Sequence, residues 1–392
     1  MSVDRGLTEP ELSVLLAYVK IGLFKQLLVS DLPGDCLDGE ELIHYFPTPL
    51  RDRFRGLMPS HRLAPDIIST ELANEIINRA GMTFIFRLSE ETGADSADIS
   101  RAYMIARQVF DMPTVWAEVE ALDNVSAAKI QTDMLLEGRK LVERASRWLL
   151  RNRPQPLDVA ANTSYFADGA RAVARVIPEL IPEDGRAQME KGVARLVAAK
   201  VPEELARRVA IYKELFSTLD IVEVAKSERM SIEDVSAVYF SLGEELDMHW
   251  IRDQIIALPR DNRWQALARA ALRDDLHSQE RILTRDVLRH ESTKSDAGSR
   301  IAAWMTHNDA AVQRCRQVLA DLKAGPKADF AMLSVAMREI RSMHTDDDTA
   351  PELESSTVVT KPKPEKAKAK AKTKAKAKAK TKAKTKAKGQ AA

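Results

Sequence analysis

The segment from Thr8 to Val29 constrains the fold more than any other part of this sequence, because apolar residues cover most of the circumference of the helix that it predicts. Thr8 can cap this helix, Pro10 suits its first turn, and Glu11 completes a Thr-x-x-Glu capping box. We expect a central core helix that is covered on several sides. Its place at the start of the chain leaves nothing upstream to cover it, which is a first indication of a fragment. The side chains that clearly point to water are Glu11, Lys20, Lys25 and Gln26.

Helical periodicity continues through the body of the chain, to about Met343. The longest helical pattern runs from Ser126 to Leu150, where an apolar stripe alternates with charged residues at i,i+3 and i,i+4 spacings. The most strand-like stretch, Thr83–Phe86, lies within helical pattern and has no partner strand, so we expect a helix there. Prolines at 178, 182 and 202 are expected to separate successive helices. The predicted fold class is all-α, with antiparallel helical bundles joined by short loops.

Two breaks divide the sequence into three parts. The motif Arg153-Pro154-Gln155-Pro156 interrupts the helical pattern and is the strongest internal boundary. From Asp346 the chain is polar, and from Lys361 it is a run of lysine and alanine that cannot build a core. We therefore expect a first helical subdomain over residues 1–152, a second helical bundle over residues 157–344, and a disordered acidic linker with a basic tail over residues 345–392.

The body and the tail have opposite charges, although the formal net charge of the whole chain is only +1. Residues 361–392 contain 14 lysines and one glutamate, which leaves 45 basic and 57 acidic residues in residues 1–360. The acidic body argues against nucleic-acid binding by the folded part, whereas the tail could neutralise several phosphates without sequence specificity. A solubilising appendage is the alternative of equal weight. The possible polyanion-binding residues are Lys366, Lys368, Lys370, Lys372, Lys374, Lys376, Lys378, Lys380, Lys382, Lys384, Lys386 and Lys388.

The motifs of the common enzyme classes are missing from this sequence. It has no GxGxxG or GxxxxGK[ST] loop for a nucleotide, no HExxH or CxxC for a metal, and no GxSxG turn for a nucleophile. His277 and Glu280 could share a helix face as metal ligands, as could Asp247 and His249. We favour ordinary surface roles for both pairs, because a metal site needs more ligands than one pair supplies and the sequence offers no second pair of ligands for either. We therefore predict no catalytic, cofactor-binding or metal-binding residue in this chain.

The two cysteines, Cys36 and Cys315, lie in different helical regions, so we do not expect a disulfide framework. We expect a reducing, cytoplasmic location. Acidic neighbours should raise the pKa of Cys36. Two flanking arginines favour a thiolate at Cys315, but helical periodicity favours a buried or half-buried structural residue. The acidic flank of the first helix and its two lysines argue against a signal peptide or a membrane span.

Two further groups of residues have structural interpretations. The segment Asn162–Phe166 opens a helix with polar side chains; we favour a solvated first turn over hydrogen bonds to a partner domain. Each tryptophan lies beside aliphatic residues in helical pattern, which predicts core or interface anchors rather than ligand-stacking residues. The tryptophans are Trp116, Trp148, Trp250, Trp264 and Trp304.

Two segments near the start of the chain, Arg5–Leu12 and Val14–Lys20, are the first of several that carry a family resemblance. They are similar to a "GLTRPELAVLLAYAK" segment, and together with the later segments, in the same order, they resemble the C-terminal helical region of the large bacterial NAD-specific glutamate dehydrogenases. The resemblance extends to about residue 343. The other similar segments are Tyr45–Pro47, His61–Leu63, Ile67–Thr70, Asn74–Gly81 and Leu219–Ala225. The lysine-alanine tail is not a feature of the family and resembles the tails of actinobacterial histone-like proteins.

The resemblance implies oxidative deamination of L-glutamate to 2-oxoglutarate and ammonia, with NAD, by a complete enzyme. In that family the glutamate site and the NAD-binding domain lie upstream of the segment where this chain begins. We therefore expect a C-terminal portion, inactive alone, that packs against the catalytic part of the dehydrogenase and supports a homo-oligomer, without binding NAD or a membrane. The alternative hypothesis is a stand-alone helical scaffold whose basic tail binds nucleic acid.

Overall fold

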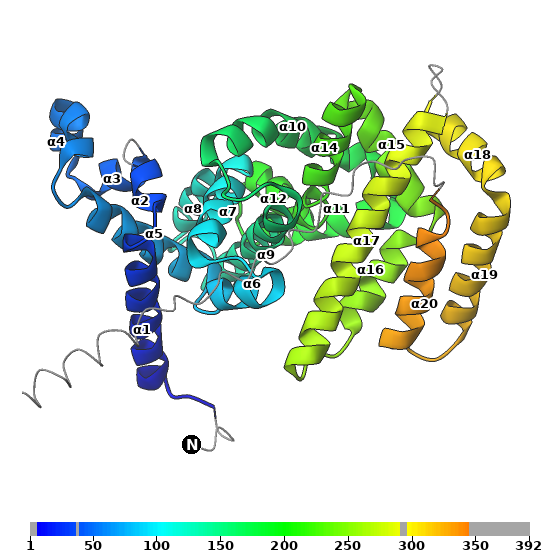
Figure 1. The fold of residues 1–392 in the computed structure, drawn as a ribbon, viewed down its shortest axis with the longest axis horizontal. Helices are drawn as coiled ribbons and strands as arrows, with labels where there is room; N and C mark the ends of the chain where they lie inside the picture. The colour runs from blue at the N-terminus through cyan, green and yellow to red at the C-terminus, as the bar shows by residue number, and fades with distance from the viewer. Residues whose placement is uncertain (1–5, 37–38, 291–295, 345–392) are drawn as a thin grey trace, which may run out of the picture. The chain divides into compact units, whose positions relative to one another are not determined.

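The fold was obtained as a computed structural model in which residues 6–36, 39–290 and 296–344 are described. Within these ranges the chain forms 20 α-helices, one short 3₁₀ helix and no β-strand, which confirms the predicted all-α class. The predicted linker and tail lie outside the described residues. The α-helices (Figure 1) are α1 (Glu9–Leu28), α2 (Leu32–Asp35), α3 (Glu40–Tyr45), α4 (Thr48–Phe54), α5 (Ala64–Ala80), α6 (Phe84–Thr92), α7 (Ser96–Val109), α8 (Met112–Glu120), α9 (Ala128–Asn152), α10 (Val159–Leu180), α11 (Glu183–Ala198), α12 (Glu203–Ala210), α13 (Tyr212–Leu215), α14 (Thr218–Glu228), α15 (Ile232–Glu245), α16 (Met248–Ala257), α17 (Arg263–His290), α18 (Ala297–His307), α19 (Asp309–Ala324) and α20 (Phe330–Arg341).

Helix α1 begins as the sequence predicts, but the expectation of a covered core helix is wrong. The Glu11 carboxylate accepts a 2.8 Å hydrogen bond from the backbone N–H of Thr8, as in a capping box. Leu23 and Leu27 are buried where α1 packs on α5, whereas Tyr18 is 70% exposed. Figure 1 shows the N-terminal turns of α1 extending past α5. The described neighbours of α1 therefore cover mainly its C-terminal half.

Helix α7 has the central position that the sequence pattern suggested for the first helix. Asp95 caps α7 by accepting a 2.9 Å hydrogen bond from the backbone N–H of Asp98. Both charged and apolar side chains of α7 are buried, because α1, α6, α8, α9 and α10 all contact it. The strand-like segment before α7 is helix α6, as predicted, and Gly81, at φ +92°, ends the preceding helix.

Contacts cross the sequence boundary near Arg153. Helix α10, which follows the boundary, packs on α7, and α13 packs on α9. Residues 1–344 form one compact unit, and the division between residues 152 and 157 stays a prediction. Pro178 does not separate two helices, because α10 continues through it to Leu180 with Ile177 buried on the core. A short break at Ile211 separates α12 from α13.

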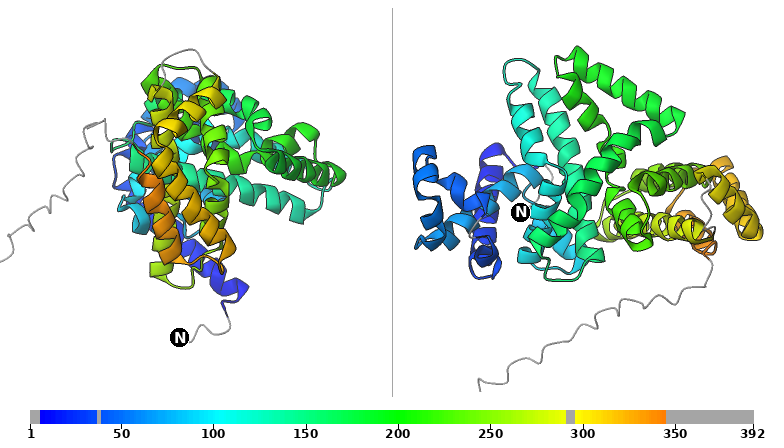
Figure 2. Two further views of the ribbon diagram at one scale, coloured as in Figure 1. Left: turned by 90° about the vertical axis from the view of Figure 1, so that its right-hand side faces the viewer. Right: turned by 90° about the horizontal axis from the view of Figure 1, so that it is seen from above.

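Helix α17 organises the C-terminal helices. It contacts α14, α15, α16, α18 and α20, and α19 packs on α20 (Figure 2). Leu276, Leu283 and Val287 form its apolar stripe and are buried. Helix α17 also carries polar side chains on the faces that these helices cover. Its packing therefore brings charged groups together in the interior.

Candidate functional site

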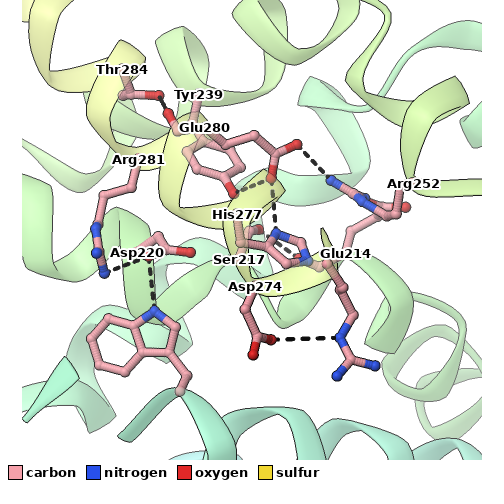
Figure 3. Close-up of polar contacts among 12 residues, drawn as sticks. Glu214, Ser217, Asp220, Tyr239, Arg252, Asp274, His277, Glu280, Arg281 and Thr284 are labelled. Carbon is pink, nitrogen blue, oxygen red and sulfur yellow. Dashed lines mark hydrogen bonds and ion pairs between the residues drawn. The ribbon is translucent and has the colours of Figure 1, made fainter. Parts of the chain in front are cut away.

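A buried carboxylate, Glu280, lies at the centre of a polar cluster in the helical interior (Figure 3). Its Oε2 accepts a 3.0 Å hydrogen bond from the Tyr239 hydroxyl and lies 2.9 Å from Nδ1 of His277. Its Oε1 accepts a 3.0 Å hydrogen bond from Nη2 of Arg252, whose Nη1 lies 3.1 Å from Glu214. These five residues, here named the Glu280 network, come from α13, α15, α16 and α17.

Arg252 lies between the two carboxylates of the Glu280 network. Burial alone would raise the pKa of Glu280, but the Arg252 guanidinium and the hydrogen bonds from His277 and Tyr239 hold it at about 2. The two carboxylates raise the pKa of Arg252 against the effect of burial. A carboxylate with so low a pKa is a poor proton acceptor near pH 7. The geometry therefore fits a structural ion pair better than an acid–base centre.

A second buried carboxylate, Asp220, has a different environment. Its Oδ1 accepts a 2.8 Å hydrogen bond from the Trp148 indole and lies 3.2 Å from Nη1 of Arg281, and its Oδ2 has no hydrogen-bond partner among the described residues. Burial raises the pKa of Asp220, and the nearby cations reduce that effect without cancelling it. Arg281 also donates a 2.9 Å hydrogen bond to Asn152. The pKa of Asp220 is therefore higher than that of an exposed aspartate.

Trp148, Asp220 and Arg281 line a cavity of about 220 Å³ between α9, α14 and α17. Arg147 and Arg151 form another part of its wall and approach Asp274, with Nε of Arg151 3.2 Å from the carboxylate. The cavity therefore combines a carboxyl of raised pKa with several guanidinium groups.

Comparison with known sequences assigns the family. The sequence profile described as "Glutamate dehydrogenase, C-terminal" matches residues 4–342. The chain belongs to the glutamate dehydrogenase C-terminal family. The NAD-specific glutamate dehydrogenase of Pseudomonas aeruginosa is 37% identical over 343 residues, which are 88% of this chain and 21% of that protein.

Two more relatives of this glutamate dehydrogenase C-terminal chain give the same result. The NAD-specific glutamate dehydrogenase of Mycobacterium tuberculosis is 37% identical over 338 residues, and that of Halomonas elongata is 34% identical over 337 residues. Each alignment covers 86% of this chain and 21% of the relative. The chain therefore spans about a fifth of the length of these relatives, and the resemblance seen in the sequence is confirmed.

The structure corrects the surface interpretation of His277 and Glu280. Both side chains are buried in the glutamate dehydrogenase C-terminal fold, because α15 and α16 cover this face of α17. Asp247 lies 2.7 Å from Lys323, so its carboxylate has a structural partner. Burial lowers the pKa of the other candidate ligand, His249. Among the described residues, no three potential ligands gather in a metal site.

Both cysteines are buried. Burial, with Glu41 and Asp35, raises the pKa of Cys36 to about 12, which agrees in direction with the expectation from its acidic neighbours. Burial raises the pKa of Cys315 to about 11 despite the flanking arginines. The structural interpretation of Cys315 is therefore confirmed and the thiolate alternative is wrong.

Three of the tryptophans, Trp116, Trp148 and Trp304, are buried, as expected of core residues. Trp264 is not a core residue, because 74% of it is exposed near the start of α17. The first turn of the segment Asn162–Phe166 is not simply solvated. Its first residue is buried and accepts a 2.9 Å hydrogen bond from Nε of Arg153, within the same chain.

The sequence reasoning missed Asp220, Arg252 and Arg147. A signal for Asp220 was present, since a lone carboxylate stands between Leu219 and Ile221 on an otherwise apolar stretch. The predicted polyanion-binding lysines, Lys366 to Lys388, lie outside the described residues. In the part of the chain that the structure describes, no helix has both the length and the apolar character needed to cross a membrane.

Proposed function

We propose that this chain is the helical C-terminal part of an NAD-dependent glutamate dehydrogenase and contributes packing and assembly rather than chemistry. The observation that carries the proposal is the family match over residues 4–342, combined with coverage of only 21% of each of the three relatives. The complete enzyme would oxidise L-glutamate to 2-oxoglutarate and ammonia, with NAD as the hydride acceptor. Its cytoplasmic location is part of the same proposal.

The exposed face of α1 is the surface we assign to the catalytic part of that enzyme. Leu15, Tyr18 and Ile21 are 43%, 70% and 49% exposed, and Val14 beside them is 55% exposed. Apolar side chains grouped in this way on one helix mark an interaction surface more often than isolated ones do. The relatives contain about four-fifths of their length outside the matched region, which supplies a partner of sufficient size.

A chimera tests the proposal. Residues 1–344 would replace the matched C-terminal region of the Mycobacterium tuberculosis relative, and glutamate-dependent NAD reduction would be measured. We expect activity in the chimera and none in the chain alone. Turnover by the chain alone would contradict the proposed division of labour. Absence of activity in a folded chimera would count against equivalence of the two regions.

A matched pair of substitutions tests the face of α1. Tyr18→Asp should weaken both the assembly and the activity of the chimera, because it places a charge within the apolar contact. Val335→Asp is the control, since Val335 is also exposed, at 47%, but lies on α20. Sedimentation velocity would report the oligomeric state, for which we propose a homo-oligomer. Equal behaviour of the two variants would exclude the α1 face as the contact.

We also propose that the lysine tail binds nucleic acid without sequence specificity. The composition of residues 361–392, with 14 lysines and one glutamate, favours this second role. Retention on duplex DNA should fall steeply with salt and disappear when residues 361–392 are deleted. Unchanged retention after the deletion would contradict the proposal and leave the solubilising role.

A further inference from the structure

A large basic cavity lies beside the polar clusters described above. It has a volume of about 860 Å³ and lies between α9, α17 and the segment that joins α16 to α17. Nine of its lining side chains are arginine or lysine, and four are aspartate or glutamate. Arg144, Arg147 and Arg273, here named the arginine cluster, line both this cavity and the 220 Å³ cavity. The arginine cluster therefore faces a large cavity whose lining has an excess of positive charge.

Most of the carboxylates that line this cavity are already paired with arginine or lysine side chains. Glu143 forms a two-pronged contact with Arg87, with both distances 2.6 Å, and Glu137 lies 2.6 Å from Lys140. Glu91 is paired with Nη2 of Arg147. The acidic lining residues thus neutralise specific partners and leave most of the remaining cations unbalanced.

The arginine cluster has hydrogen-bond donors that no described residue satisfies. Among the described residues, Arg144 has no ion pair or hydrogen bond, and Arg273 has only a 3.8 Å contact with Asp274. Arg147 is buried, and its Nε and Nη1 have no hydrogen-bond partner in the described part of the chain. Buried, planar donors of this kind are suited to carboxylate or phosphate oxygens.

The electrostatic environment also favours an added negative charge. Burial and the nearby Arg273 lower the pKa of both Arg144 and Arg147, because burial and a neighbouring cation both disfavour the charged form of a guanidinium group. Arg139 and Arg260 line the same cavity without a carboxylate partner among the described residues. An anion in this space would reduce the repulsion among all five guanidinium groups.

We propose that the arginine cluster binds a small organic anion with at least two negative charges, carried by phosphate or carboxylate groups. The guanidinium groups would hold the charged groups through paired N–H donors. The wall of the cavity formed by Leu141, Ile256 and Leu258 offers apolar surface for the body of the ligand. This site is independent of the proposed dehydrogenase role, because it rests on the cavity and on guanidinium N–H groups that no described residue satisfies.

Thermal unfolding of the full chain tests the site, with sodium pyrophosphate, sodium succinate or sodium chloride at equal ionic strength. At saturation, we expect pyrophosphate or succinate to raise Tm by at least about 2 °C above the chloride value. Anions bound by the lysine tail should attach to the folded and unfolded chain alike and leave Tm unchanged. Pyrophosphate alone would identify phosphate as the preferred group, and succinate alone would identify carboxylate.

Substitutions assign the effect to the arginine cluster. Arg144→Gln should weaken anion binding at least about tenfold, because it removes a planar cationic donor from the cavity. Arg175→Gln is the control, since Arg175 is exposed on α10 and also has no ion pair or hydrogen bond among the described residues. Arg273→Gln provides a second test if the first variant does not fold. No rise in Tm above chloride, or equal binding by the cluster and control variants, would overturn the proposal.

Discussion

The Glu280 network and the arginine cluster are two groups of interior charges that share helix α17 but differ in completeness. In the first, both terminal nitrogens of Arg252 lie 3.0–3.1 Å from carboxylate oxygens of Glu280 and Glu214. In the second, Arg144 has no ion pair or hydrogen bond among the described residues. Nε of Arg252 lacks a hydrogen-bond partner among the described residues, but both of its terminal nitrogens are paired, and a buried ion pair of this kind supports one fold. A cluster with unneutralised guanidinium groups beside a cavity is suited to bind an anion from solution.

The difference follows from which elements supply the acidic groups. Four elements converge on Glu280, and two of them supply the partners Tyr239 and Arg252. Around the arginine cluster, Glu143 and Glu137 on α9 are paired with Arg87 and Lys140, outside the cluster. Glu91 on α6 is paired with one member of the cluster, Arg147. The arginine cluster therefore has a local surplus of positive charge, because α9 and α17 bring more arginines than free carboxylates to this region.

Removal of the central carboxylate should have the largest effect. Glu280→Ala would leave Arg252 buried with only one of its two carboxylate partners, which should destabilise the chain by about 3–5 kcal/mol. Urea unfolding followed by circular dichroism would measure it. Glu137→Ala is the matched control, since its exposed pair with Lys140 should contribute less than about 1 kcal/mol. Equal losses in the two variants would contradict the distinction between a buried network and a surface pair.

Acidification should remove the contribution of the Glu280 network. The pKa of Glu280 is about 2 in the fold, below its ordinary value of 4.5, so its contribution is present above pH 4.5 and is lost as the pH falls towards 2. The maximum effect is on the order of 3 kcal/mol. Unfolding of the native chain and of Glu280→Gln should therefore be compared at pH 6 and pH 3. The difference between them should shrink at pH 3, and a constant difference would contradict the assignment.

Asp220 should respond to pH with the opposite sign. Burial raises its pKa, so its favourable contribution is present below its ordinary pKa and is lost as the pH rises through the raised value. Asp220→Asn keeps a hydrogen-bond acceptor for Trp148, and we expect a change within about 1 kcal/mol at pH 7. Its stability relative to the native chain should increase from pH 4 to pH 8. A relative decrease would show that Asp220 is held as a stable ion pair, like Glu280.

Local features of the fold could be predicted from the sequence, because they depend on neighbouring residues. The capping residues Thr8 and Glu11 gave the start of α1 to within one residue. Pro178 misled the prediction because only two residues of α10 follow it, and the buried Ile177 holds that end of the helix on the core. The exposure of α1 could not be predicted, because an apolar stripe does not reveal which segment covers it.

The candidate sites were predictable only in part. The i,i+3 spacing of His277 and Glu280 correctly placed them on one face of α17, but their burial depends on α15 and α16, which come from other parts of the sequence. The unpaired state of Arg144 was beyond sequence reasoning for the same reason. Glu137 and Glu143 lie close to it along α9, and the structure shows that other cations occupy both of them.

The substitution with the smallest expected effect on stability gives the clearest distinction between the Glu280 network and the arginine cluster. Arg144→Gln in chloride should be neutral or should stabilise the chain by up to about 1 kcal/mol, because it removes a half-buried cation that repels Arg273. In saturating pyrophosphate the sign should reverse, because the native chain gains anion binding that the variant lacks. Arg252→Gln should destabilise the chain in both salts, since its carboxylate partners are part of the fold. Destabilisation by Arg144→Gln in chloride, equal to that of Arg252→Gln, would show that Arg144 is already satisfied within the fold.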